Sequence, residues 1–338
     1  MLADILSHPI IIVVIIIFIA LIFDFINGFH DAANSIATVV STQVLKPHQA
    51  VMWSALFNFA AVFFLGVKVA KTVGTGIINP AVVDNMLILS ALGGAIAWNL
   101  ITWWLGLPSS SSHALIGGLI GSGLVKGGLR IVIWKGVLKT ASFIVLSPVI
   151  GLLLGFLLMV IVLNLFRRSN VGSANRIFRR MQLFSAGIYS ISHGMNDAQK
   201  TMGIIAVVLF SNGMTGNVYN IPIWVILSCY TVIALGTMAG GWRIVKTMGT
   251  KITKLQPIGG FCAETAAAIS IIGASVAGIP VSTTHTITGA ITGVGSTKRL
   301  SAVRWGVAGT IVWAWVLTIP VSGLIASGLY FLLKSFMA

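Results

Sequence analysis

The sequence predicts an all-α polytopic membrane protein made of two inverted repeats, each with about five membrane segments and with broken or half-length helices meeting at the midplane. Three observations support this prediction. Of the 338 residues 57% are hydrophobic and 8% are charged, and the mean hydropathy is +1.01, whereas soluble domains carry about 25% charged residues. Apolar runs of the ~20 residues that cross a bilayer recur along the chain. Two pairs of polar motifs also recur in the same order in each half.

Residues 1–166 are expected to form the first repeat. The first apolar stretch runs from about 10 to 44 and would be ~50 Å long as one helix, so we expect a break near Asn27 and Gly28. Later segments are expected at about 49–67, 85–106, 108–125 and 136–165. The short segment 108–125 follows Pro108, and proline favours the first position of a new helix.

Residues 167–181 hold five arginines and are expected to form a basic cytoplasmic connection to the second repeat, 182–338. Segments of this repeat are expected at about 182–210, 221–241, 258–278, 280–297 and 305–333. One fixed offset places His113 on His285, with Gly117 on Gly289 and Gly121 on Gly293. We interpret this match as an internal duplication. An odd number of crossings in each copy inverts the second copy, as in many secondary transporters.

The formal net charge of +15 does not indicate a nucleic-acid partner, because Lys and Arg collect in short loops between apolar runs. Basic loops on the inner side orient membrane proteins. With the N-terminus outside and every segment crossing, the inner loops hold more Lys and Arg than the outer loops, although the basic loop 126–139 falls outside. We therefore expect the lipid bilayer as partner and the cell inner membrane as location.

Acidic residues are rare, and their positions carry most of the functional signal. Asp4 and Asp84 lie near predicted ends and are expected to be solvated. The other four lie within predicted membrane segments, where each carboxylate costs about 2.5–3.5 kcal/mol: Asp24, Asp31, Asp197 and Glu264. Asp24 is expected to be either a structural hydrogen-bonding group or a partner of the helix break.

Asp31 and Asp197 occupy matching motifs, GFHDAANS at 28–35 and HGMNDAQKT at 193–201. Together with Glu264 they are predicted to be cation or metal ligands. Carboxylates beside amides and free backbone carbonyls form an oxygen cage for a hard cation. Burial can instead turn such a carboxylate into a proton carrier by raising its pKa. The sequence leaves both interpretations open.

A second pair of motifs, LPSSSSH at 107–113 and IPVSTTH at 279–285, is predicted to bind an anion. Each proline can open a helix, so the hydroxyls that follow lie at a helix N-terminus, where free N–H groups and the helix dipole attract anions. Two such ends facing each other from inverted repeats would hold one anion. The hydroxyl groups concerned belong to Ser110, Ser111, Ser112, Ser282, Thr283 and Thr284.

His113 and His285 end these motifs and are expected to bind the anion, to carry protons or to cap the helices. An anion near Asp31 and Asp197 is repelled unless cations accompany it, and Lys200 is the one basic residue with a fixed charge in the motif region. The sequence therefore predicts symport of an anion with cations. A channel and a permease for sulfate or another oxyanion are the alternatives.

An enzyme is not expected. Ser112 and His113 invite comparison with a serine hydrolase, but adjacent residues do not face each other on a helix. A duplicated pair also fits a symmetric binding site better than a single nucleophile. No cofactor is expected beyond sodium or protons as coupling ions.

The four motifs resemble the Pit-type inorganic phosphate transporter family, whose duplicated signature is G-A-N-D-x-A-N. The two copies here read GFHDAAN at 28–34 and GMNDAQK at 194–200, and the Ser/Thr–His clusters and the tripeptide AET at 263–265 are also similar. The resemblance covers nearly the whole chain and implies an inverted-repeat symporter of inorganic phosphate in a bacterial inner membrane. It implies phosphate at the Ser/Thr clusters and coupling cations at Asp31, Asn34, Asn196 and Asp197.

Two departures from the signature matter. His30 replaces an asparagine in the first copy, and Lys200 replaces one in the second. Each exchanges an oxygen ligand for a nitrogen base or a fixed cation, so either residue could contact a proton or the anion. A symmetric pair of sodium sites is therefore not expected. Sodium, proton and metal–phosphate coupling all stay open, as does assembly into a homo-oligomer.

Overall fold

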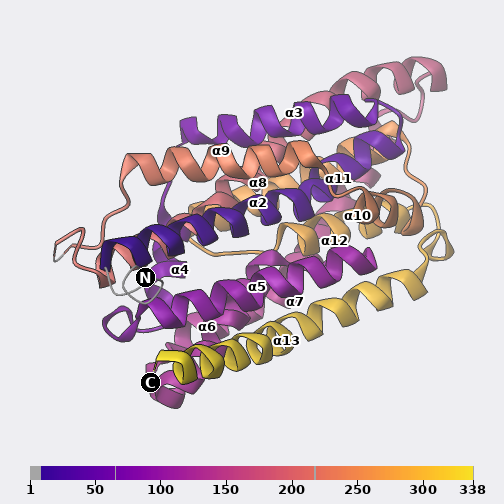
Figure 1. The fold of residues 1–338 in the computed structure, drawn as a ribbon. Helices are drawn as coiled ribbons and strands as arrows, with labels where there is room; N and C mark the ends of the chain where they lie inside the picture. The colour runs from indigo at the N-terminus through magenta and orange to yellow at the C-terminus, as the bar shows by residue number, and fades with distance from the viewer. Residues whose placement is uncertain (1–8, 65, 217, 338) are drawn as a thin grey trace.

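The computed structural model describes residues 9–64, 66–216 and 218–337 (Figure 1). Asp4 lies outside them. The first half contains α2 (Pro9–Ser41), α3 (Pro47–Ala60), η1 (Ala61–Phe64), α4 (Lys68–Gly76), η2 (Pro80–Val82), α5 (Asn85–Leu105), α6 (Ser111–Gly127), η3 (Gly128–Ile131) and α7 (Trp134–Leu165). The second half contains α8 (Val171–Ser211), α9 (Ile223–Ala239), α10 (Trp242–Lys246), the π-turn η4 (Thr247–Lys251), α11 (Pro257–Val276), α12 (Thr283–Ser296), η5 (Leu300–Ala302) and α13 (Trp305–Met337).

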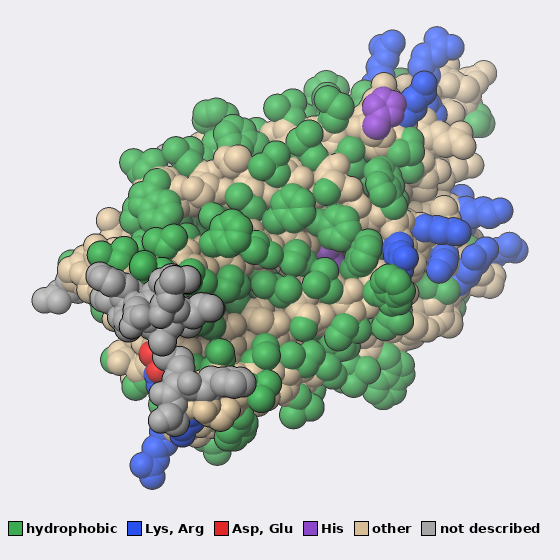
Figure 2. Space-filling view, in the orientation of Figure 1, with side chains coloured by type: hydrophobic (Ala, Val, Ile, Leu, Met, Phe, Trp, Pro, Cys, Tyr) green, Lys and Arg blue, Asp and Glu red, His purple; other side chains and the backbone are tan. Residues whose placement is uncertain are grey.

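The chain is a multi-pass membrane protein. Among the described residues six helices are long and apolar enough to cross a membrane, or up to eight if each of two bent pairs counts as one span. Figure 2 shows apolar side chains covering the flank of the molecule, while most of the visible Lys and Arg side chains gather at one end. α12, with 14 residues, is only about 21 Å long, which is too short to cross a ~30 Å core.

Both halves follow the same order of elements, and each has a short helix that the sequence did not predict. After α3 and η1 the chain bends by 85° into α4, and after α9 it bends by 62° into α10. The expected segments 49–67 and 221–241 therefore continue as helix after a bend. Lys68 and Lys71, expected in a loop, lie on α4.

The predicted break near Asn27 and Gly28 is wrong, because α2 continues without interruption through both residues. Gly28 serves a helix crossing instead. A Cβ atom there would lie 2.2 Å from the carbonyl oxygen of Ile233 on α9, so only glycine allows the backbones to come this close. Gly194 on α8 has the equivalent place against Asn58 on α3, at 2.6 Å.

α12 is a short helix, as expected, whereas α6 together with η3 (Ser111–Ile131) is long enough to count as a candidate span. The glycines of both helices make close backbone contacts, as predicted. A Cβ at Gly121 would lie 2.1 Å from the carbonyl oxygen of Gly323 on α13, and a Cβ at Gly293 would lie 2.1 Å from that of Leu152 on α7. Each half-helix therefore lies directly on a long outer helix of the opposite half. In Figure 1 α6 lies toward the end of the molecule that holds both chain termini, and α12 toward the other end.

α8 begins at Val171 rather than near 182, so Arg176, Arg179 and Arg180 are already on the helix. Two apolar cores fill the bundle. On α2 the stretch 13–23 contributes to one core and 33–39 to the other. Asp24, Asn27, His30 and Asp31 on α2 are buried polar residues between these stretches, and Asp197 lies between the corresponding stretches of α8. The fold thus sets a polar layer between two apolar cores.

Candidate functional site

The starts of α6 and α12 meet in the polar layer. Extended residues 107–110 and 279–282 lead into the two helices. The hydroxyl of Ser110 accepts a hydrogen bond from the backbone N–H of His113 (3.3 Å), and that of Ser282 accepts one from His285 (3.2 Å). Both serines are therefore helix caps. The Ser112 hydroxyl donates to the carbonyl of Val281 at 3.5 Å, which joins the two starts.

Among the hydroxyl groups at the two helix starts, that of Ser111 is unpaired in the described residues. Its side chain is buried, and its Oγ has no hydrogen-bond partner among the described residues. A buried unpaired hydroxyl costs about 1–3 kcal/mol, and such a cost is tolerated where a ligand supplies the partner. Ser111 lies in the first turn of α6, next to backbone N–H groups that the helix leaves unpaired. This end of α6 therefore offers donors for an anion.

The long helices α2 and α8 bind these starts reciprocally. Asn34 on α2 donates to the hydroxyl of Thr284 on α12 at 2.8 Å. Lys200 on α8, three residues after Asp197 as Asn34 is after Asp31, donates to the hydroxyl of Ser112 on α6. The long helix of each half thus bonds the hydroxyl cluster of the other half, α2 at α12 and α8 at α6.

Asp31 and Asp197 come together at this point. One carboxylate oxygen of each, together with a ring nitrogen of His193, lies within 4.8 Å of the others. Asp31 accepts from the Thr284 hydroxyl at 3.4 Å, and Asp197 accepts from the Thr283 hydroxyl at 3.3 Å. Both halves thus bring a carboxylate to the hydroxyl groups at the start of α12.

His30 and His193 stand beside the two carboxylates. Nδ1 of His30 lies 2.9 Å from Oδ1 of Asp31, and its Nε2 lies 3.1 Å from the hydroxyl of Thr102 on α5. Nε2 of His193 lies 3.2 Å from Oδ2 of Asp197, and its Nδ1 lies 3.0 Å from Oδ1 of Asn58 on α3. Each imidazole therefore links a carboxylate to a polar group on a third helix.

Glu264 is not part of the Asp31–Asp197 group. It accepts from Gln182 (3.0 Å) and from Ser185 (2.5 Å), both on α8. The predicted metal ligands Asp31, Asp197 and Glu264 thus do not form one cluster among the described residues, since His193 takes the third place. The side chain of Glu264 is fully buried, and it forms a separate polar group that the sequence could not distinguish from the first.

The remaining predicted residues lie at the edges of the site. Asn196 donates to the hydroxyl of Ser275 at 2.9 Å, while its Oδ1 has no partner among the described residues. The rings of His113 and His285 lie 4.9 Å apart, and His285 stacks on Trp315 at 3.9 Å. The two histidine rings, one from each half, are therefore in contact, and each histidine directly follows the hydroxyl cluster of its own half.

Several polar residues of α8 were missed as site residues. Gln182, Ser185, Tyr189 and His193 follow one another at intervals of three or four residues and lead to Asn196, which was predicted; this is the spacing of one helix face. This stripe would have pointed to His193.

Two further acidic residues lie outside the Asp31–Asp197 group. Asp24 accepts from Thr201 at 2.8 Å, which makes it a link between α2 and α8 and agrees with the structural alternative predicted for it. Asp84, predicted to be solvated, caps α5 and pairs with Lys126.

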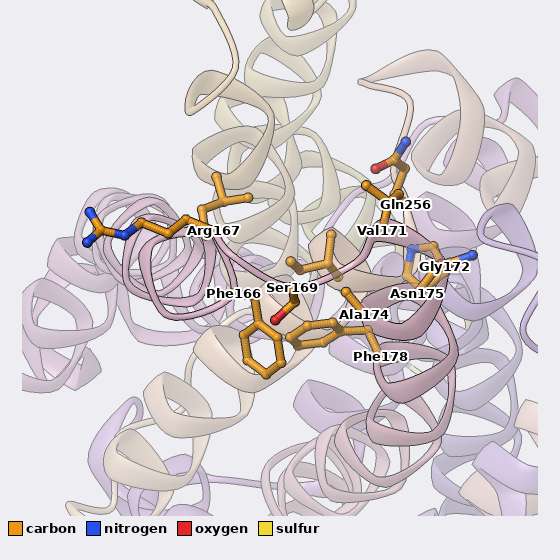
Figure 3. Close-up of a pocket in the computed structure, with 12 residues that line it drawn as sticks. Phe166, Arg167, Ser169, Val171, Gly172, Ala174, Asn175, Phe178 and Gln256 are labelled. Carbon is orange, nitrogen blue, oxygen red and sulfur yellow. The ribbon is translucent and has the colours of Figure 1, made fainter.

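A pocket of about 460 Å³ lies elsewhere, between the end of α7, the first turns of α8 and the start of α11 (Figure 3). Phe166 and Phe178 face each other there with ring centroids 4.9 Å apart, and Arg167 points away from them. None of the predicted site residues lines this pocket. It therefore gives no reason to move the candidate site away from the polar layer.

The site is closed in this structure. Asp31 is 2% exposed, Ser112 is 4% exposed and Asp197 is fully buried. A solute reaches these groups only if packed helices move. A multi-pass helical bundle with two facing half-helix starts and a buried pair of carboxylates defines a membrane transporter, in agreement with the class predicted from the sequence.

Comparison with known proteins identifies the family. Residues 27–175 and 167–326 match the phosphate transporter family, and the chain belongs to that family, as its motifs predicted. It is 59% identical to a probable low-affinity inorganic phosphate transporter of Rhizobium meliloti (strain 1021), over 94% of this chain and 95% of the relative. A relative with the same description from Bacillus subtilis (strain 168) is 45% identical, over 96% of this chain and 98% of the relative.

The fold also matches a solved structure described as the sodium-dependent phosphate transporter. The TM-score is 0.87 and the sequence identity is 28%, over 96% of this chain and 99% of the other. The agreement extends over nearly the whole of both chains. It confirms the all-helical membrane architecture that the sequence predicted.

Proposed function

We propose that this chain is a cation-coupled symporter that carries inorganic phosphate across the inner membrane by alternating access. The observation that carries the proposal is the meeting of two half-helix starts beside two buried carboxylates from opposite halves. The names of the relatives support phosphate as the substrate. Sulfate or another oxyanion is the competing substrate.

Phosphate would bind between the starts of α6 and α12. Its oxygens would accept from free backbone N–H groups and from the hydroxyls of Ser111, Ser112, Thr283 and Thr284, while Ser110 and Ser282 hold the helix ends in place. Phosphate near neutral pH keeps a proton and can donate it in a hydrogen bond, which sulfate cannot do. The carboxylates of Asp31 and Asp197 are acceptors at the right place for that donor, which favours phosphate.

Coupling follows from charge. The carboxylates of Asp31 and Asp197 have oxygens within 4.8 Å of each other, and they lie beside the helix starts where the anion would bind. They repel that anion unless cations arrive with it. Asp31, Asn34, Asn196 and Asp197 would hold such cations, and His30 or His193 would hold a proton if protons are the coupling ions. Sodium is supported by the description of the similar solved structure.

Alternating access is supported by the repeated order of elements in the two halves and by the reciprocal contacts at the site. Each half-helix lies on the long outer helix of the other half, so α6 with α13 and α12 with α7 form two units. Rocking of one unit against the other would open the closed site first to one side and then to the other.

The test is phosphate uptake into proteoliposomes with a sodium gradient and a proton gradient imposed separately. We expect accumulation under one gradient, and no inhibition by excess sulfate. Liposomes that hold Asp31→Asn protein serve as the matched control, and we expect them to lose gradient-driven uptake. Accumulation that needs neither gradient, or current without a co-ion, would contradict symport.

A further inference from the structure

Lys200 is one of the two residues that replace an asparagine of the family signature. Its side chain is 2% exposed, and its ammonium donates to three oxygens of different kinds. These are Oδ1 of Asp197 at 2.5 Å, the hydroxyl of Ser112, and the backbone carbonyl of Val281 at 3.0 Å. A carboxylate, a hydroxyl and a backbone carbonyl are also the oxygen types that coordinate a hard metal cation.

The first half has a neutral group at the equivalent place. Asn34 follows Asp31 by three residues and bonds Thr284, just as Lys200 follows Asp197 by three residues and bonds Ser112. Both places lie at a hydroxyl of a half-helix start and three residues after a carboxylate on the same helix. Lys200 bonds its carboxylate directly, whereas Asn34 bonds the hydroxyls of Thr283 and Thr284. The two places also differ in that one side chain is an amide and the other carries a positive charge.

We propose that the ammonium of Lys200 is a resident cation that occupies the coupling-ion position of the second half, so that the chain binds one coupling ion fewer than a symmetric site would. The inference rests on the proposed function. A resident cation lowers the repulsion between the carboxylates and the incoming phosphate. It stays attached to α8 when the phosphate leaves, so it assists binding without adding to the driving force for accumulation.

The charges of the site agree with this arrangement. Asp31 and Asp197 place two negative charges within 4.8 Å, and Lys200 contacts only the second of them among the described carboxylates. Asp31 has the imidazole of His30 and the hydroxyl of Thr284 as partners. A mobile cation is therefore needed mainly at Asp31, where the partners carry no fixed charge.

The experiment measures how phosphate affinity depends on sodium. The purified full-length chain is titrated with inorganic phosphate at several sodium concentrations, with choline keeping the ionic strength constant. The slope of log affinity against log sodium gives the number of sodium ions that bind with phosphate. We expect a slope no greater than one for the natural chain. In Lys200→Asn, which restores the oxygen ligand, the slope should rise by one, and the affinity without sodium should fall by about tenfold or more.

Two further variants separate this role from simple loss of a phosphate contact. Lys200→Met removes the charge without adding an oxygen, so it should lose affinity with no rise in slope. Lys126→Asn removes a lysine that pairs with Asp84 at the far end of α6 and should change neither quantity. Binding of radioactive sodium should give one more ion per chain in Lys200→Asn than in the natural chain.

The inference is overturned by a slope of two in the natural chain, a result that needs no variant. It is equally overturned if Lys200→Asn binds phosphate with the same slope as the natural chain. Both results leave the proposed function intact, because phosphate still binds. A natural chain that binds and transports no phosphate at all would overturn the proposed function instead.

Discussion

The two half-helices of this protein are near copies of each other, whereas the two helices that approach them are not. α6 and α12 share the proline, the capping serine, the hydroxyls, the histidine and the glycines at one fixed offset. α2 and α8 share the aspartate, but two equivalent positions of their motifs differ. Lys200 replaces the asparagine found at Asn34, and His30 replaces the asparagine found at Asn196. The comparison indicates that the predicted anion side of the site is nearly the same in the two halves, whereas the predicted cation side differs between them.

The largest effect is expected when the aspartates of α2 and α8 are changed one at a time. Asp31→Asn and Asp197→Asn should both abolish gradient-driven uptake, but only Asp197→Asn leaves a buried ammonium without its counter-charge. Loss of one partner from a buried ion pair costs about 3–5 kcal/mol. We therefore expect a lower thermal midpoint for Asp197→Asn than for Asp31→Asn, measured on purified protein. Equal thermal midpoints would show that the buried ammonium of Lys200 does not need the carboxylate of Asp197 as its counter-charge.

A second effect tests the symmetric side. Gly121→Ala and Gly293→Ala place a Cβ atom 2.1 Å from a backbone carbonyl oxygen on α13 and on α7. The backbones must separate, and overpacking of this kind costs about 1–3 kcal/mol. Similar losses of thermal stability in the two variants are expected. Gly309→Ala is the control, because a Cβ there meets nothing within 4 Å.

A third, smaller effect distinguishes two equivalent hydroxyls. Ser111 has no partner for its Oγ among the described residues, whereas Thr283 donates to Asp197. Ser111→Ala should raise the KM for phosphate about tenfold and should raise the thermal midpoint of the free protein, because it removes a buried hydroxyl that has no partner among the described residues. Thr283→Val should raise the KM and also lower the midpoint. If Ser111→Ala leaves the KM unchanged, its hydroxyl does not bind phosphate.

The smallest effect is expected at Glu264, which the sequence placed among the cation ligands and which lies in a separate group with Gln182 and Ser185. Glu264→Gln keeps the size of the side chain and part of its acceptor capacity. We expect uptake to fall by about tenfold or less, against complete loss in Asp31→Asn. A loss as large as that of Asp31→Asn would make Glu264 an obligatory site for the coupling ion.

Local signals predicted the half-helices well. A proline followed by serine or threonine and then glycines specifies a helix start and a close helix contact within a few residues, and Gly121 and Gly293 make such contacts. Ser110 and Ser282, predicted to bind the anion, cap the two helices. Gly28 shows the limit of such signals. A glycine in a long apolar run can mark a break or a crossing, and the decision depends on Ile233, which is 205 residues away in the sequence.

The arrangement of the charged groups could not be predicted for the same reason. The partners of Lys200 include Ser112 and Val281, which are 88 and 81 residues away. The helices α4 and α10 were missed because they are short and follow sharp bends. Glu264 was assigned to the central site because charge alone does not tell which layer of a bundle a side chain enters.

Pro148 lies inside α7, and its effect extends to α12. It lacks an N–H, so the carbonyl of Ile144, four residues earlier, has no partner within the helix. Nδ1 of His285 lies 3.4 Å from that carbonyl oxygen, while Val145 and Val149 on the same helix face outward. This bond and the close contact of Gly289 with the carbonyl of Pro148 join the two helices, so a change in the tilt of α7 moves the start of α12 with it.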